Sequence, residues 1–326
     1  MSDPLLHRIS LVVPVYCGEK TLPLLLSEIE PLSTAQLTPN GLRYVVCEVI
    51  LVHDCGPDHS DKVLEELASK YMFVKTVWLS RNYGQHAATM AGMASATGNW
   101  VVTIDEDGQQ NPWDIGLMLD HALSESLQLV YAHPTNAPPH GRLRNIFSKS
   151  AKMIAKRLLS NSSISNFNSF RLIDGEIART LAAYCGNGVY LDVGLFWIAG
   201  RVGHFPVMLR AELGRPSGYS YFKLFGHFWN LVLTTGTKPL RLITFLGLFS
   251  IVLAFGITGY AFYCKFFTHD PVQGWASLLV IVSFFSGAIL ISLGLIAEYL
   301  AVTTGIVMGK PLYVVSSKPT RTGVRK

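Results

Sequence analysis

Two carboxylates and a carboxamide follow one apolar stretch of the chain at a spacing that suits a divalent cation. Asp105 and Asp107 come directly after the apolar residues 100–104, and Gln109 adds a neutral oxygen. Oxygen ligands of this kind hold Mg²⁺ or Mn²⁺, and these ions keep further positions for water and phosphate oxygens. A solvated acidic loop is the alternative, because many strands end in one. The pattern indicates a candidate site for a metal-bound phosphate compound.

The elements that must position these acids alternate along the first part of the chain. Continuous apolar runs separated by segments of helical spacing indicate an α/β fold with a mainly parallel sheet covered on both faces. Ligands bind such sheets beyond the carboxyl ends of the strands, where Asp54, Arg81 and the acidic cluster would all lie. We expect strands at 9–15, 44–52, 74–79, 100–104 and 127–132, and helices at 19–31, 58–71 and 85–96.

Composition and motifs exclude several classes of protein. No Gly-x-Gly-x-x-Gly follows the first strand and no Walker A sequence is present, so dehydrogenases and P-loop enzymes lose their main support. The net charge is +5, but the sequence has no block of Lys and Arg, so we expect no nucleic-acid partner. A protein surface that lies against anionic lipid explains the excess of basic residues. The five cysteines are scattered without zinc-ligand spacing, which fits a reducing cytosol.

Two uncharged apolar runs, 243–262 and 275–297, lie near the C-terminus. Each is long enough to cross a hydrocarbon core of roughly 30 Å. A pair of buried helices in a soluble protein is the alternative, although globular helices usually keep a polar face. Lys and Arg flank the outer ends of the pair, so the positive-inside rule predicts a multi-pass protein of the inner (plasma) membrane with the large domain and both termini in the cytoplasm.

These features divide the chain into four parts. We expect a catalytic domain at 1–215, an interfacial amphipathic region at 216–238, a two-helix transmembrane hairpin at 239–300 and a cytoplasmic tail at 301–326. Aromatic residues mixed with Lys223 in 217–229 favour a helix at the lipid headgroups, with a core helix as the alternative. The polar N-terminus leads into a strand, so we expect no cleavable signal. Small residues on the apolar runs favour a homo-oligomer.

A series of short motifs resembles a known family. In their order and spacing they resemble family 2 glycosyltransferases of the GT-A fold. Within that family the chain is similar to the polyprenyl-phosphate glycosyltransferases, namely the dolichol-phosphate mannosyltransferase group and its bacterial relatives with two C-terminal helices. The resemblance covers nearly the whole chain. The motifs are Pro14-Val15-Tyr16, Val52-His53-Asp54, Leu79-Ser80-Arg81-Asn82, Ile104-Asp105-Glu106-Asp107-Gly108-Gln109 and Phe170-Arg171-Leu172.

The resemblance implies a donor side formed by the first strands. Asp54 would hydrogen-bond the nucleotide base, whereas Asp105 and Asp107, with Gln109, would hold the metal and the donor diphosphate. The other donor-binding positions that it implies are Pro14, Tyr16, Glu19 and Arg81.

The resemblance also implies catalytic roles for Asp107, Arg171 and Ser169. Arg171, helped by Ser169, would meet the acceptor phosphate, and a structural salt bridge is the alternative for Arg171. Arg142 and Arg144 lie where relatives carry a basic loop on the acceptor side, or they form a solvated basic face.

The chain departs from the family pattern at four places. Cys17-Gly18 replaces the usual Asn-Glu, Glu106 replaces the alanine of the common Asp-Ala-Asp, and Gln110 follows Gln109 where relatives have aspartate or histidine. Ser169 lies where many bacterial members have aspartate. These differences leave the donor sugar and any aspartate general base open, while the predicted metal ligands are retained.

The resemblance implies a membrane enzyme that moves a hexose from a nucleotide sugar to polyprenyl (undecaprenyl) phosphate at the cytoplasmic face. UDP-glucose is the first candidate donor, with GDP-mannose, a UDP-N-acetylhexosamine or UDP-4-amino-arabinose as alternatives. We expect a metal-dependent, inverting reaction. A non-catalytic membrane scaffold that retains the fold is the alternative from another class. A processive synthase would need more membrane spans than two.

Overall fold

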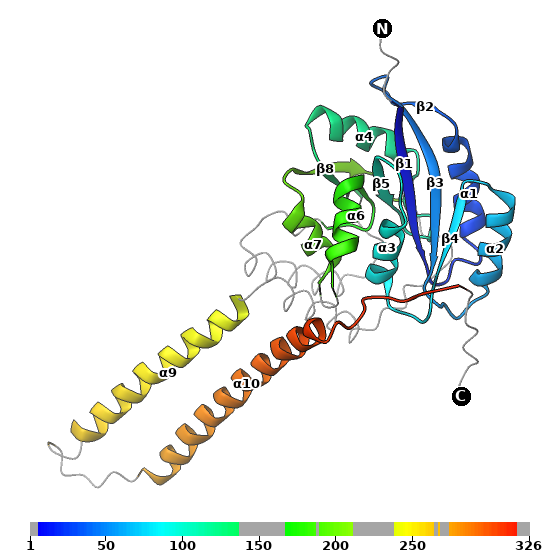
Figure 1. Cartoon of the computed structure of the whole chain (residues 1–326). Coiled ribbons are helices and arrows are strands. Elements are labelled where there is room, and N and C mark those ends of the chain that lie inside the picture. The colour runs from blue at the N-terminus through cyan, green and yellow to red at the C-terminus, as the bar shows by residue number, and fades with distance from the viewer. Residues whose placement is uncertain are drawn as a thin grey trace.

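A mixed sheet of nine strands forms the body of the protein, and two long helices project from it (Figure 1). The computed structural model describes residues 6–136, 167–186, 189–210, 238–263, 267 and 274–317. The strands are β1 (Leu6–Val15), β2 (Gln36–Leu37), β3 (Arg43–His53), β4 (Val74–Leu79), β5 (Trp100–Thr103), β6 (Leu129–Pro134), β7 (Arg171–Asp174), β8 (Val202–Val207) and β9 (Val315–Ser316). The helices are α1 (Leu22–Ile29), the 3-10 helix η1 (Glu30–Ser33), α2 (Ser60–Lys70), α3 (Gln85–Ala94), α4 (Asp114–Ser124), α6 (Gly175–Tyr184), α7 (Leu191–Ile198), α9 (Lys238–Tyr263) and α10 (Trp275–Val307).

The sheet differs from the expected mainly parallel arrangement. Its order is β8-β6-β7-β5-β1-β3-β4-β9, with β2 paired to β3. The pairs of β1 with β3 and β5, and of β3 with β4, are parallel, as the apolar runs predicted. Strand β7 runs antiparallel between β5 and β6, and β2 and β9 also pair in the antiparallel sense. The N-terminal end of β7 therefore lies beside the carboxyl end of β5.

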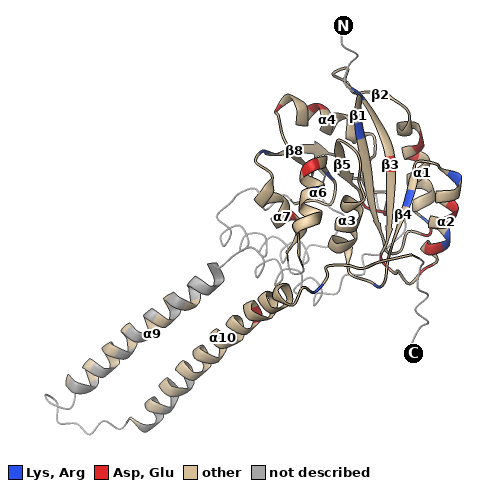
Figure 2. Cartoon of the chain, in the orientation of Figure 1, with Lys and Arg blue, Asp and Glu red and all other residues tan. Residues whose placement is uncertain are grey.

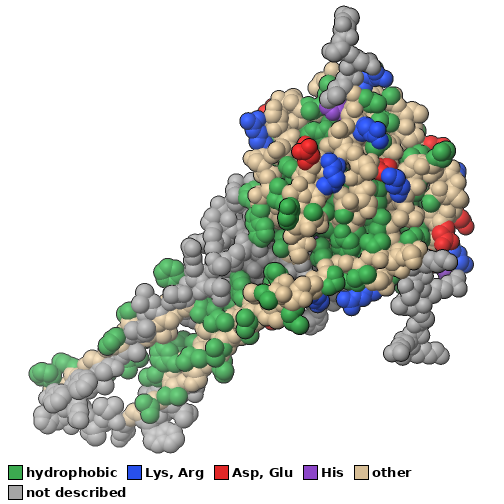
Figure 3. All heavy atoms as spheres, viewed as in Figure 1, with side chains coloured by type: hydrophobic (Ala, Val, Ile, Leu, Met, Phe, Trp, Pro, Cys, Tyr) green, Lys and Arg blue, Asp and Glu red, His purple; other side chains and the backbone are tan. Residues whose placement is uncertain are grey.

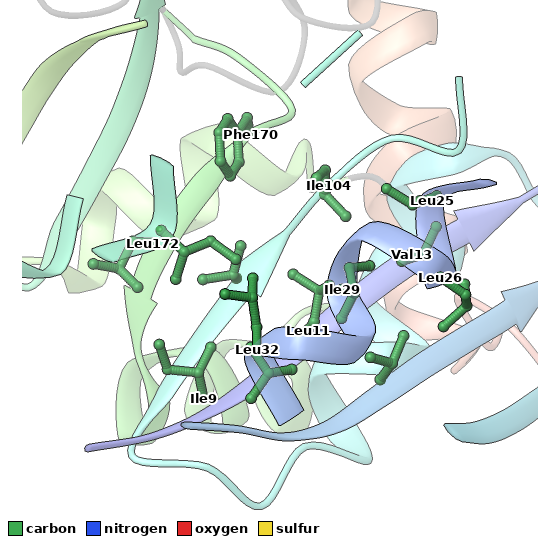
Figure 4. Packing of buried hydrophobic residues seen from close by; sticks show 14 of the residues in the cluster. Ile9, Leu11, Val13, Leu25, Leu26, Ile29, Leu32, Ile104, Phe170 and Leu172 are labelled. Carbon is green, nitrogen blue, oxygen red and sulfur yellow. The ribbon is translucent and has the colours of Figure 1, made fainter. Parts of the chain in front are cut away.

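Alternating side chains of β1 enter two separate hydrophobic clusters. Leu11 and Val13 pack on one face with α1, whereas Val12 packs on the other face with α3. Helix α1 buries a stripe at i, i+3, i+4 and i+7, made of Leu22, Leu25, Leu26 and Ile29, and Figure 4 shows part of this stripe above β1. Both faces of the sheet are covered, as expected from continuously apolar strands.

Helix α3 packs against the sheet at the position of a glycine. A Cβ added to Gly92 would lie 2.3 Å from Val12 Cγ1 and 3.1 Å from Val52 Cγ2. Any larger residue would push α3 away from the sheet, so this close approach holds the start of α3 near the carboxyl ends of the strands.

The two C-terminal helices are antiparallel neighbours that expose apolar side chains (Figures 1 and 3). In Figure 2 the ribbon is coloured for charged residues on the body and, on the described part of these helices, only near the end of α10 at the body. Within the described residues, one helical stretch, Phe284–Val307, is long and apolar enough to cross a membrane, and none of it is buried in the protein. The second expected span, at 243–262, falls in the 26-residue helix α9.

The segment after α10 returns to the body. Strand β9 pairs with β4, and Ser80 N donates to Val314 O at 2.9 Å. Leu312 and Tyr313 pack against the cluster that contains α3. The residues expected to form a separate tail thus begin inside α10, which ends at Val307, and then extend the sheet. Residues 216–237 of the interfacial region predicted at 216–238 lie outside the described residues, and so do Arg142 and Arg144.

Glu48 in β3 is a buried carboxylate that joins four segments of the body. Its carboxylate accepts hydrogen bonds from Ser10 Oγ (2.5 Å), Thr97 N (2.6 Å) and Thr97 Oγ1 (2.8 Å), and it pairs with Lys75 Nζ at 2.5 Å. Burial raises the pKa of Glu48, but the hydrogen bonds from Lys75, Ser10 and Thr97 outweigh burial and lower it to about 2. The ionised carboxylate therefore stabilises the alignment of β1, β3 and β4.

We predict that Glu48→Gln lowers the free energy of unfolding by about 1–3 kcal/mol near neutral pH, the cost of weakening hydrogen bonds to a charged group. Because the folded-state pKa of about 2 lies below the ordinary 4.5, this stabilisation is full above about pH 5 and is lost as the pH falls through about 2. Thermal unfolding of the full-length protein in detergent from pH 7 to pH 2 measures the effect. The exposed Glu65→Gln is the control, and a wild-type advantage over Glu48→Gln that does not shrink on acidification would contradict the prediction.

Candidate active site

Neutral donors from three segments hold the carboxylate of Asp105, which follows β5. Gln85 Nε2 donates to Oδ1 at 2.7 Å, and Gln110 Nε2 donates to Oδ2 at 2.9 Å. Ser169 Oγ also donates to Oδ2, in a short hydrogen bond. These groups come from the start of α3, the loop after β5 and the residues before β7. The structure thus brings together two predicted site residues, Asp105 and Ser169.

Gln85 and Gln110 were not predicted as site residues. Gln110 Oε1 also accepts a hydrogen bond from Asp105 N at 2.9 Å, and its amide contacts Ser169 Oγ at 2.9 Å. The proximity of Gln110 to the acidic cluster in the sequence is a signal that could have identified it. Gln85 offers no such signal, because its contact depends on how α3 packs against the sheet.

The two aspartates lie in an environment that disfavours their charge. Burial raises the pKa of Asp105 to about 6, and the charge of Asp107 adds to this, while Ser169, Arg171 and Gln110 lower it. Burial also raises the pKa of Asp107, although Gln109 N donates to Asp107 Oδ1 at 3.0 Å. A divalent cation would offset the repulsion between these carboxylates, so their chemistry fits the predicted metal.

Few charged side chains in the described part of the chain are placed to bind a cation at this position. No cluster of three or more His, Cys, Asp and Glu residues within the described ranges forms a metal site. Asp105 and Asp107 would therefore hold a cation together with neutral oxygens, such as that of Gln109, and with phosphate oxygens of a ligand. Mg²⁺ commonly binds in this way, through one or two carboxylates and substrate phosphates.

Arg171 is buried beneath this cluster and forms an ion pair. Its Nε and Nη2 lie 2.7 and 3.0 Å from the two carboxylate oxygens of Asp192 in α7. Its Nη1 donates to Thr103 Oγ1 at 3.2 Å and to the carbonyl of Ser169 at 3.1 Å. Tyr131 Oη donates to Asp192 Oδ1 at 3.0 Å. Arg171 thus forms the salt bridge that was the structural alternative for this residue, here with Asp192. A contact between Arg171 and an acceptor phosphate stays a prediction.

Asp54 has a buried carboxylate that holds the turn before α3. Tyr83 N and Gly84 N donate to its two oxygens at 2.7 and 2.8 Å. Burial raises the pKa of Asp54 to about 6, and these two hydrogen bonds lower it only in part. Arg81 is exposed and lies over the Tyr83 ring at 4.8 Å. The predicted base-binding carboxylate therefore already has two donors from the backbone.

The remaining donor-binding predictions concern the loop after β1. Pro14 is partly buried near the end of β1, and Tyr16 is 44% exposed. Glu19 Oε2 accepts a hydrogen bond from His59 N at 3.2 Å, which ties this loop to the start of α2. The exposed Tyr16 ring is the group of this set that a ligand can reach directly.

The residues from β1 to α6 match a known family. The model of glycosyl transferase family 2 matches residues 10–181, more than half of the 326 residues of the chain. This chain is a member of glycosyl transferase family 2. The predicted family is therefore confirmed, and so is the prediction that the protein is an enzyme that transfers glycosyl groups.

Relatives of this glycosyltransferase match it almost from end to end. The undecaprenyl-phosphate 4-deoxy-4-formamido-L-arabinose transferase of Klebsiella pneumoniae (strain 342) is 29% identical over 322 residues, or 97% of this chain and 94% of that protein. The bactoprenol glucosyl transferase of Shigella phage SfX is 25% identical over 315 residues, or 95% and 99%. The crystal structure of glucosyl-3-phosphoglycerate synthase from Mycobacterium tuberculosis with Mn²⁺ and uridine-diphosphate-glucose matches 71% of this chain and 79% of its own, with 20% identity and a TM-score of 0.49.

We predict that Asp192→Asn lowers the free energy of unfolding of this glycosyltransferase by about 3–5 kcal/mol, because it leaves the buried Arg171 without a compensating charge. The double variant Arg171→Met/Asp192→Asn should regain part of that loss. Chemical denaturation of the detergent-solubilised protein measures both.

The half-exposed pair of Arg210 and Glu28 provides the matched control. Arg210→Met should cost under about 1 kcal/mol. Equal effects of Asp192→Asn and Arg210→Met would contradict a structural role for the buried pair.

Proposed function

We propose that this glycosyltransferase moves a hexose from a nucleotide sugar to undecaprenyl phosphate or a similar polyprenyl phosphate. The observation that carries the proposal is the length of the similarity. The Klebsiella and phage relatives, whose names both specify a polyprenyl carrier, match 97% and 95% of this chain, so the shared part includes α9 and α10. A catalytic body attached to exposed apolar helices suits an acceptor that is held in a bilayer.

The donor is the less determined substrate. The two relatives are named for different sugars, a formamido-arabinose and glucose. UDP-glucose is our first candidate, and GDP-mannose, a UDP-N-acetylhexosamine and UDP-4-amino-arabinose are the alternatives. The parallel strands β4, β3, β1 and β5, followed by the antiparallel β7, support the GT-A fold expected for a nucleotide-sugar enzyme.

The apolar helices support a membrane location. We propose that α9 spans the bilayer beside the candidate span Phe284–Val307 of α10, so that the active site and both termini face the cytoplasm at the inner membrane. The predictions of an interfacial region and of a homo-oligomer remain part of this proposal.

The reaction that we propose is a direct displacement. A phosphomonoester has a second pKa of about 6 and is largely a dianion near neutral pH, so the acceptor needs little help from a base. An acceptor phosphate oxygen forms a bond to the anomeric carbon, while the bond from that carbon to the donor diphosphate breaks and its electron pair leaves with the nucleoside diphosphate. A bound Mg²⁺ or Mn²⁺ would stabilise charge on the departing diphosphate.

The residues of the chain would position this chemistry. Asp105 and Asp107, with Gln109, would hold the cation. Ser169 and Gln85 orient the Asp105 carboxylate. Arg171, helped by Ser169, would meet the acceptor phosphate, and the guanidinium of Arg171 donates to the Ser169 carbonyl.

A scaffold without activity remains the alternative from another class. The departure at Cys17-Gly18 favours it. The departure at Gln110 does not, because Gln110 contacts both Asp105 and Ser169 in the site.

We predict that the purified protein releases UDP or GDP from its donor only when undecaprenyl phosphate and Mg²⁺ or Mn²⁺ are present. Asp107→Asn should lower kcat/KM at least about 100-fold, equivalent to about 2.7 kcal/mol, because it removes a charged metal ligand. Coupled detection of the free nucleoside diphosphate measures the rate, with Glu65→Gln as a control of unchanged activity. Absence of release with all of the candidate donors would favour the scaffold.

We also predict that the product has the opposite anomeric configuration to the donor, because a single displacement inverts the reacting carbon. NMR coupling constants of the purified lipid-linked sugar decide this. A product that retains the donor configuration would rule out the single displacement while leaving the substrates unaffected.

A further inference from the structure

Glu106 lies between the two predicted metal ligands in the sequence, and its carboxylate contacts the loop after β1. Tyr16 N donates to Glu106 Oε2 at 3.0 Å, and Cys17 N donates to Glu106 Oε1 at 2.9 Å. One carboxylate thus accepts hydrogen bonds from two consecutive backbone amides, with one oxygen for each.

The next two amides of the loop also have side-chain acceptors. Gly18 N donates to Ser60 Oγ at 2.8 Å, and Glu19 N donates to Asp58 Oδ2 at 3.1 Å. Asp58 Oδ1 in turn accepts from Ser60 Oγ at 2.7 Å. Four consecutive amides, from residue 16 to residue 19, are therefore satisfied by side chains from two other segments of the chain.

Two glycines leave the space that this arrangement needs. A Cβ added to Gly18 would lie 2.7 Å from Glu106 Oε2 and 2.7 Å from Leu22 Cγ. A Cβ added to Gly56 would lie 1.4 Å from the carbonyl oxygen of Tyr16. A side chain at position 18 would therefore require both the Glu106 carboxylate and the Leu22 side chain to shift from the positions that they have here.

Consecutive backbone amides at a turn commonly form a concavity that binds anions such as phosphate. Here the first two amides already have an anion, the carboxylate of Glu106. A charge-assisted hydrogen bond is about twice as strong as a neutral one, so this pairing also holds the loop in place. A donor diphosphate would have to displace Glu106 to reach these two amides.

We infer that Glu106 is a positioning residue that fills the anion site of the β1 loop and fixes the loop relative to the acidic turn. The loop carries Tyr16, and the turn carries Asp105 and Asp107 on either side of Glu106. On the proposed function, on which this consequence rests, Glu106 sets the distance between the nucleotide pocket and the metal-bound diphosphate. It also directs the diphosphate to the metal rather than to the loop amides.

Hydrogen–deuterium exchange of the full-length protein in detergent, without donor or metal, tests the contact itself. In Glu106→Ala, amides 16 and 17 should exchange at least about tenfold faster than in the wild type, read from peptides that cover residues 14–20. Glu106→Gln should be intermediate, because one carbonyl oxygen can accept only part of the original pair and its NH₂ group opposes an N–H. The exposed Glu65→Ala is the control. Unchanged exchange in Glu106→Ala and Glu106→Gln would overturn the inference.

Binding of UDP and GDP with MgCl₂, followed by the change in melting temperature, tests the consequence for the donor. We expect Glu106→Ala to weaken nucleotide binding and to raise the donor KM about tenfold, with a smaller change in kcat, and Glu106→Gln to restore part of the affinity. Nucleotide affinity in Glu106→Ala within twofold of the wild type would overturn the positioning role. If the wild type binds neither nucleotide, the proposed function fails, and the exchange rates alone decide whether Glu106 holds the loop.

Discussion

The partial burial of the Asp105 carboxylate beside Asp107 is the constraint on which this edge of the protein depends. A carboxylate in that position loses hydration, and its neighbour Asp107 repels it. Three side chains without formal charge, those of Gln85, Gln110 and Ser169, donate hydrogen bonds to this carboxylate. They orient its oxygens without neutralising its charge. A positive charge close to such a carboxylate would therefore stabilise its ionised form. On the proposed function, a cation bound together with a phosphate ligand would supply that positive charge, so binding of the substrate would complete the site.

The antiparallel strand β7 is what brings Ser169 to this carboxylate. Because β7 starts beside the end of β5, the residues before it reach the same edge as the parallel strands. The buried pair of Arg171 and Asp192 stabilises this entry, since the guanidinium contacts both Thr103 in β5 and the Ser169 carbonyl. The buried charges of Arg171 and Asp192 thus support this edge of the sheet, whereas the carboxylates of Asp105 and Asp107 are the candidate metal ligands on it.

The parts of the fold predicted from the sequence are those with local signals. The parallel strands are continuously apolar, and the acids that follow β5 are close together in the chain. Strand β8 contains Gly203, His204 and Pro206, and β9 has two residues, so neither carries the pattern of a buried strand. Their place in the sheet depends on partners far along the chain.

The same distinction holds within the site. The spacing of the acidic cluster identifies Asp105 and Asp107 as candidate metal ligands, and that role stays a prediction. The environment of Arg171 was not predictable, because its partner Asp192 lies 21 residues further on and at the start of another helix. The hydrogen bond from Gln85 depends likewise on the packing of α3. Residue type indicates which interactions a side chain can make. Its burial and its partners decide whether it contacts a ligand or holds another side chain that contacts the ligand.

The return of the chain from α10 to β4 has a mechanical consequence. The body is joined to the apolar helices in two places, once through the chain that leads into α9 and again through β9, which is hydrogen-bonded into the sheet. A double attachment restricts rotation of the body about the helices more than a single linker does, and β9 also covers the last two residues of the β4 edge, Trp78 and Leu79. The double attachment therefore limits how far the rim that carries the acids can tilt relative to the hairpin.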